Sequence, residues 1–172
     1  MSLRDALREG TRGAHDALDA RMSALDLDIS SDLRVFLEIS ASGWAGIGPV
    51  GMAQGTLDEM RAALALDLTA LGGTPAAVPA AQPVRHPLAG AYLVLGSRLG
   101  LGLLARRFAA ARPRAYLGLA PCGPLWRALC AELAAMPAEG AEARAVIGDA
   151  AAHFETWTGL AAMRLEEVAD VA

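Results

Sequence analysis

The chain has 172 residues, of which 54% are hydrophobic, and its formal net charge is −4. This length predicts one domain with a single core, and the abundance of Ala and Leu over β-branched residues predicts an all-α fold. The acidic balance argues against a general nucleic-acid binder, and the complete lack of lysine excludes a Walker A site and Schiff-base chemistry.

The first predicted helix covers about residues 3–25, where apolar residues recur at three- and four-residue steps. His15 lies at the border of its apolar and charged faces, close to Arg8, Arg12 and Asp19. A lone histidine in such a place is usually an ordinary interfacial residue. An imidazole flanked by guanidiniums would also suit a flat apolar ligand with an anionic rim, with His15 on a metal and the arginines on carboxylates.

Serines provide candidate caps, Ser2 for the first helix and Ser30 or Ser31 for the second. The second helix is expected to fray in the glycine-rich stretch 43–49. Three further helices are predicted over about 50–71, 88–110 and 124–136, and a last one after residue 137. The proline-rich stretch 74–87 is expected to be an extended surface connection.

The predicted helix 88–110 carries Gly96 and Gly100 one turn apart on the same face. A glycine inside a helix costs about 1 kcal/mol relative to alanine, so the pair needs an explanation. One explanation is close packing of two helices through small residues. The other is a flat ligand that lies against the backbone, where any Cβ would collide with it. The sequence leaves both explanations open.

Nothing in the composition points to a membrane or a secreted protein. The first residues lack the apolar region of a signal peptide. The apolar segment 88–105 contains Arg98 near its middle, which is costly in lipid and favours a buried helix. Cys122 and Cys130 fit neither a CxxC nor a zinc spacing, so they are expected to be reduced core residues. The expectation is a cytoplasmic protein without membrane insertion.

Two segments carry a family resemblance. Residues 3–15, Leu-Arg-Asp-Ala-Leu-Arg-Glu-Gly-Thr-Arg-Gly-Ala-His, are similar to an opening helix that ends in a proximal histidine. Residues 92–100, Tyr-Leu-Val-Leu-Gly-Ser-Arg-Leu-Gly, are similar to a distal helix that is followed by a basic pair, here Arg106-Arg107. Weaker similarity occurs near Tyr116, near Trp126 and over 154–157. Together these segments resemble the bacterial, biliverdin-producing heme oxygenases.

The resemblance implies a single-domain, all-α, heme-oxygenase-like bundle over residues 1–172. The implied activity is oxidative cleavage of heme to biliverdin with release of iron and CO. Heme would be substrate and cofactor, with O2 and an electron-donor ferredoxin or reductase as partners. The site residues that it implies are His15 as axial ligand of the heme iron, Arg8, Arg12 and Asp19 around the heme, and Gly96, Ser97 and Gly100 on the catalytic distal face.

The chain departs from the family pattern at two positions. Leu95 stands where many bacterial members have Glu, and Leu101 stands where a second small residue is frequent. These departures motivate one alternative, a heme-binding or heme-sensing protein of the same fold without turnover. Another alternative is an enzyme of the thiaminase or quinone-cofactor type on the same bundle, in which His15 is incidental. Asp149 and His153 form a possible metal pair, but a buried histidine is the simpler interpretation.

Overall fold

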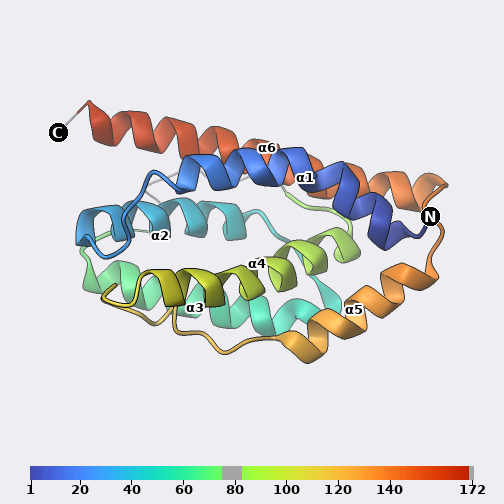
Figure 1. Cartoon of the computed structure of the whole chain (residues 1–172), viewed down its shortest axis with the longest axis horizontal. Helices are drawn as coiled ribbons and strands as arrows, with labels where there is room; N and C mark the ends of the chain where they lie inside the picture. The colour runs from blue at the N-terminus through green and yellow to red at the C-terminus, as the bar shows by residue number, and fades with distance from the viewer. Residues whose placement is uncertain (75–82, 171–172) are drawn as a thin grey trace.

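The computed structural model describes residues 1–74 and 83–170, and this part of the chain forms a single all-helical domain (Figure 1). The predicted all-α class is therefore confirmed. Its helices are α1 (Leu3–Met22), α2 (Ser30–Ala45), the short 3-10 helix η1 (Gly51–Ala53), α3 (Gln54–Ala70), α4 (Pro87–Arg107), α5 (Gly123–Ala135) and α6 (Ala141–Ala169).

The helices form one bundle around a shared core. α1 lies alongside α6 along one edge of Figure 1, and α2 packs against both α3 and α6. α4 packs against α3, α5 and α6. By length and composition it is the one helix in the described residues that could cross a membrane. Its buried face, which includes Leu93, Val94 and Leu95, lies in the core of the bundle.

The first two helices begin where the sequence predicts, but only one of them has the predicted cap. Ser2 caps α1 in a reciprocal capping box with Asp5, as expected. α2 begins at Ser30, yet Ile29 occupies the cap position and makes no side-chain cap hydrogen bond. The serine cap predicted for α2 is therefore wrong. α1 also ends at Met22, three residues before the predicted end at residue 25.

The sequence predicts that α2 frays from residue 43 onward. The helix instead continues through Gly43 and ends at Ala45. A Cβ on Gly43 would overlap the indole ring of Trp157 on α6. The glycine therefore serves close helix packing and does not end the helix. Trp157 in turn donates a hydrogen bond from Nε1 to the Ile39 carbonyl oxygen at 2.8 Å, which fixes α6 against α2.

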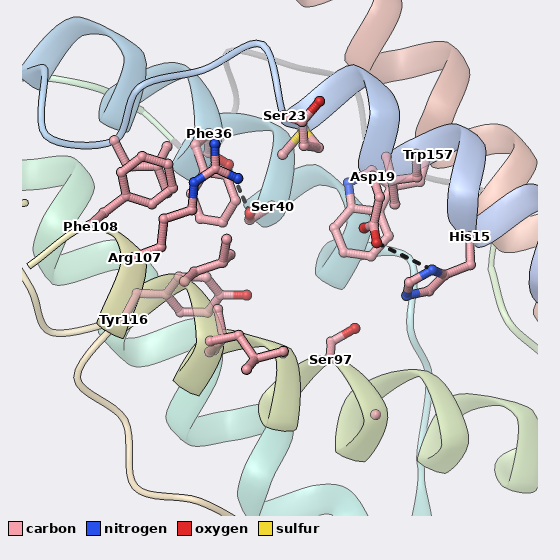
Figure 2. Close-up of a pocket in the computed structure, with 18 of the residues that line it drawn as sticks. His15, Asp19, Ser23, Phe36, Ser40, Ser97, Arg107, Phe108, Tyr116 and Trp157 are labelled. Carbon is pink, nitrogen blue, oxygen red and sulfur yellow. Dashed lines mark hydrogen bonds and ion pairs between the residues drawn. The ribbon is translucent and has the colours of Figure 1, made fainter.

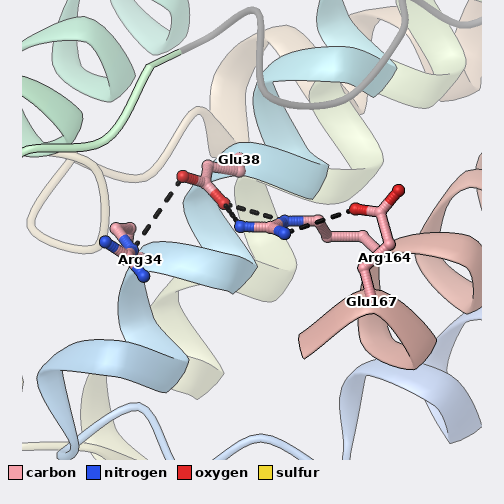
Figure 3. A network of polar contacts seen from close by, with 4 residues as sticks. All are labelled: Arg34, Glu38, Arg164 and Glu167. Atoms are coloured by element: carbon pink, nitrogen blue, oxygen red, sulfur yellow. Dashed lines mark hydrogen bonds and ion pairs between the residues drawn. The ribbon is translucent and has the colours of Figure 1, made fainter. Parts of the chain in front are cut away.

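A buried ion pair joins the same two helices further along (Figure 3). Nε and Nη2 of Arg164 on α6 lie 3.0 and 2.7 Å from Oε2 of Glu38 on α2, whose side chain is 4% exposed. Arg34 and Glu167 extend the network toward solvent. Its two charges compensate each other inside the bundle.

The connection before α4 is only partly described, since residues 75–82 lie outside the described part of the chain. His86 ends this connection at the N-cap of α4, where its Nδ1 accepts a hydrogen bond from the Leu88 amide. Asp149 accepts hydrogen bonds from the amides of Arg85 and His86. Asp149 thus anchors the connection, and His153 is a buried histidine, as the simpler interpretation held.

Candidate functional site

A cavity of about 440 Å³ lies between the C-terminal halves of α1 and α4 (Figure 2). This volume is typical of small-molecule sites. Most of the lining is apolar, with a few polar side chains among aromatic and aliphatic ones. The lining residues are His15, Leu18, Asp19, Met22, Ser23, Leu27, Phe36, Ser40, Trp44, Gly96, Ser97, Gly100, Leu101, Leu103, Leu104, Arg107, Phe108, Tyr116, Phe154 and Trp157.

The cavity begins beyond a contact between α1 and α4. The two helices run in the same direction across Figure 1. They meet where Oγ1 of Thr11 lies 3.5 Å from the hydroxyl of Tyr92. Beyond this contact, residues of both helices line opposite sides of the cavity. Trp44 of α2 and Trp157 of α6, with ring centroids 4.7 Å apart, form part of the wall between them.

His15 lies at the edge of the cavity, with its side chain 52% exposed. Its Nδ1 is 3.4 Å from Oδ2 of Asp19 and 3.7 Å from Oδ1 of Asp16. Its ring meets Phe154 edge-on, with centroids 5.3 Å apart. A carboxylate next to Nδ1 favours the tautomer that carries its proton there and leaves Nε2 free as a ligand. Figure 2 shows the ring directed from α1 toward the α4 side.

Gly96 and Gly100 line the cavity on α4, and the structure argues against the packing explanation for this pair. A Cβ on Gly100 would have no described atom within 4 Å outside its own helix backbone and chain neighbours, and one on Gly96 would make ordinary contact with Trp126 at 3.6 Å. By contrast, a Cβ on Gly90 would collide with Val50. Packing against Val50 therefore requires glycine at position 90, whereas position 100 borders open space.

Of the other α4 residues named in the sequence analysis, some line the cavity and some are buried outside its lining. Ser97 and Leu101 line the cavity, and within the described residues the Ser97 hydroxyl makes no hydrogen bond. Leu95 is fully buried and lies outside the lining, so the departure at that position does not reach the cavity. Arg98 is also buried and pairs with Glu59 at 3.0 Å. The departure at Leu101 therefore bears on the site, and that at Leu95 does not.

The predicted grouping of Arg8 and Arg12 with His15 is corrected by the structure. Both arginines line a separate surface hollow of about 290 Å³ with Asp5 and Glu9. The cavity extends from His15 toward the C-terminal end of α1, where Asp19 lines it as predicted. Arg8 and Arg12 precede His15 toward the other end, where α1 meets α4.

Arg107 is the arginine that lines the cavity. It is the last residue of α4 and is exposed, with its guanidinium carbon 4.9 Å from the centre of the Phe108 ring. The sequence identifies Arg107 only as the second residue of the basic pair Arg106-Arg107. Because guanidinium binds carboxylates well, this position is suited to an anionic group of a ligand at the cavity edge.

Sequence reasoning did not place Tyr116 in the site. This residue follows α4 in an irregular segment and is 2% exposed. Nε1 of Trp44 donates a hydrogen bond to its hydroxyl at 2.8 Å. Burial raises the pKa of the Tyr116 phenol above its ordinary value, and hydrogen bonds with Trp44 and Ser40 offset this only in part. The phenol therefore remains protonated at neutral pH.

The arrangement can hold a metal only through a ligand that brings its own coordination. Among the described residues no group of three or more His, Cys, Asp or Glu side chains could hold a metal ion. His15 can supply one imidazole at the edge of an apolar cavity. Cys122 and Cys130 are both free thiols, with Cys122 buried and outside the cavity lining.

The chain was compared with protein-family models, with curated proteins and with solved structures, and none of these comparisons found a match.

Proposed function

We propose that this protein binds heme in the cavity between α1 and α4 and cleaves it oxidatively to biliverdin, with release of iron and CO. One observation carries the proposal: His15 of α1 and Gly96 and Gly100 of α4 line the same largely apolar cavity. These residues come from the two segments in which the sequence resembles heme oxygenases. The resemblance concerns two segments that are far apart in the sequence, and residues of both segments line this one cavity.

The residues of the cavity fit heme at each of its parts. His15 would ligate the iron through Nε2, with Asp19 next to Nδ1. Gly100 leaves open space on the opposite side, where a flat macrocycle can approach the backbone. Arg107, and not Arg8 or Arg12, would meet the propionates, because it alone among these three lines the cavity.

When bound, heme supplies both the macrocycle that is cleaved and the iron that reacts with O2. The chain supplies orientation and surroundings. His15 would bind one face of the heme, and the apolar lining would limit access of water to it. On the α4 side, Ser97 offers a hydroxyl that makes no other hydrogen bond within the described residues. Electrons come from a separate ferredoxin or reductase in this proposal, and O2 from solution.

Leu101 supports a second candidate function, heme binding or sensing without turnover. Its side chain lines the cavity and is 4% exposed, at a position where heme oxygenases often have a small residue. A bulky side chain there reduces the space that O2 and ordered water would occupy next to the macrocycle. Binding would then survive while cleavage is lost.

The test is an optical titration with hemin of wild-type protein, His15→Ala and a matched control, His86→Asn. The control removes a histidine that lies outside the cavity lining, and Asn can replace its role as a helix cap. Ascorbate or a ferredoxin system is then added under air, and biliverdin is measured by its absorbance. We expect one-to-one binding with a histidine-ligated spectrum in wild type and His86→Asn, but not in His15→Ala.

Each outcome separates the two candidates. Conversion of bound heme to biliverdin would support the oxygenase. Stable binding through His15, with the heme spectrum retained and no biliverdin formed under electron supply, would favour the sensor or carrier. Absence of specific hemin binding would refute both.

A further inference from the structure

Tyr116 is held at the cavity wall by hydrogen bonds at its backbone and at its hydroxyl. The carboxylate of Asp67, 2% exposed on α3, accepts hydrogen bonds from the amides of Ala115 and Tyr116 at 2.9 and 2.8 Å. Trp44 holds the hydroxyl from the other end at 2.8 Å. The phenol ring also packs against Phe36, with ring centroids 6.3 Å apart. A buried carboxylate and a buried indole thus fix both ends of one residue.

The protons around this hydroxyl can be assigned from the chemistry of its neighbours. An indole N–H can only donate, so Trp44 occupies one lone pair of the Tyr116 oxygen. Ser40 donates its own proton to the Phe36 carbonyl oxygen at 2.8 Å. The Tyr116 proton therefore remains to be donated, and an acceptor atom inside the cavity can receive it. Donation by Trp44 polarises the phenol and strengthens it as a donor.

We infer that Tyr116 is a specificity-determining hydrogen-bond donor, which selects ligands that place an acceptor oxygen against this wall of the cavity. Figure 2 shows its hydroxyl directed toward the interior, on the same side as Ser40. A ligand oxygen placed against this wall would accept the Tyr116 proton. The inference deepens the proposed function and rests on it only in taking this cavity as the ligand site, since it does not require heme.

The test uses two small probes of nearly the same shape, 1-indanone, which has an acceptor carbonyl, and indane, which lacks it. Their dissociation constants are measured by NMR titration of the indole N–H signals, because Trp44 and Trp157 line the cavity. The ratio of the two constants cancels the hydrophobic contribution that the probes share. We expect Tyr116→Phe to lower the wild-type preference for 1-indanone by about fivefold to tenfold, the value of one hydrogen bond.

Two further variants separate this role from a structural one. Tyr92→Phe removes the other tyrosine hydroxyl, which lies outside the cavity lining, and should leave the preference unchanged. Ser40→Ala removes the neighbouring hydroxyl, which already donates to the Phe36 carbonyl oxygen, so the preference for 1-indanone should be kept, because Tyr116 supplies the donor. This second variant keeps the inference testable even if Tyr116→Phe folds poorly.

An equal preference in wild type and Tyr116→Phe would overturn the inference, as would loss of the preference in Ser40→Ala. Failure of both probes to bind wild type would overturn it as well, because a donor that faces an accessible cavity must discriminate between them. The outcome is independent of hemin. Probe discrimination without hemin binding would refute the proposed function alone, and hemin binding without discrimination would refute this inference alone.

Discussion

Oδ2 of Asp19 lies 3.4 Å from Nδ1 of His15, one helical turn further along α1. The spacing of four residues places both side chains on one face of the helix, and both line the cavity. A carboxylate behind an imidazole fixes its tautomer and orientation and makes the other nitrogen a better metal ligand. The Nδ1 atom of His15 therefore already has Asp19 as a partner, and its Nε2 atom remains available to a ligand in the cavity.

Removing this carboxylate should weaken hemin binding. We expect Asp19→Ala to raise the dissociation constant for hemin by about tenfold, the size of effect that the loss of a carboxylate beside a metal-ligating histidine usually has. Optical titration measures it. Asp16→Ala is the matched control, because Asp16 lies 3.7 Å from the same nitrogen and carries the same charge but lies outside the cavity lining. Equal losses in the two variants would show that only general charge matters.

Gly100 gives a prediction in which stability and binding change in opposite directions. An added Cβ meets open space, so Gly100→Ala should raise the free energy of unfolding by about 0.5–1 kcal/mol. The same methyl group would collide with a flat ligand on the backbone and should weaken hemin binding about tenfold. Urea denaturation and hemin titration measure the two effects.

Gly102→Ala is the control for this prediction. Gly102 lies in the same helix and also has open space beside it, but it does not line the cavity. It should therefore raise stability in the same way without changing hemin affinity. If Gly100→Ala bound hemin as tightly as Gly102→Ala does, the ligand would not lie against this part of α4.

Most of the helices could be predicted because their signals are local. Apolar residues at helical spacing indicate α1 and α3, and Ser2 marks the start of α1 that the structure also has. The end of α2 could not be predicted in this way. Gly43 breaks a helix by propensity, but here it accommodates Trp157, which lies far away in the sequence. Tertiary packing overrides the local signal.

The site was only partly predictable, for a geometric reason. A helical wheel gives the direction of a side chain around the axis, but not where along the axis a cavity opens. It therefore grouped Arg12 with His15, although the contact between Thr11 and Tyr92 brings α1 and α4 together at that end. Tyr116 has no periodic signal at all, because it lies in an irregular segment. Its position depends on Asp67, a contact between distant parts of the sequence.

The ion pair between Glu38 and Arg164 should contribute strongly to stability (Figure 3). We expect Glu38→Ala to lower the free energy of unfolding by about 2–4 kcal/mol, because Arg164, only 17% exposed, would lose its main partner. Urea denaturation measures the change. Glu167→Ala removes a carboxylate that is 54% exposed and pairs with the same guanidinium, so its effect should be much smaller. A comparable loss would show that burial does not decide the contribution.

Tyr116 should make stability depend on pH at the alkaline end. Its folded-state pKa is raised, chiefly by burial, so the unfolded chain releases this proton at a lower pH than the folded protein does. The stabilisation is fully present below the ordinary tyrosine pKa of about 10 and is lost as the pH rises above it. In Tyr92→Phe, Tyr116 is the remaining tyrosine, so its ionisation can be followed alone by absorbance. We expect phenolate to appear only together with unfolding measured by circular dichroism. Phenolate that forms near pH 10 in the still-folded protein would contradict the burial of this hydroxyl, and with it the role of Tyr116 as a neutral donor.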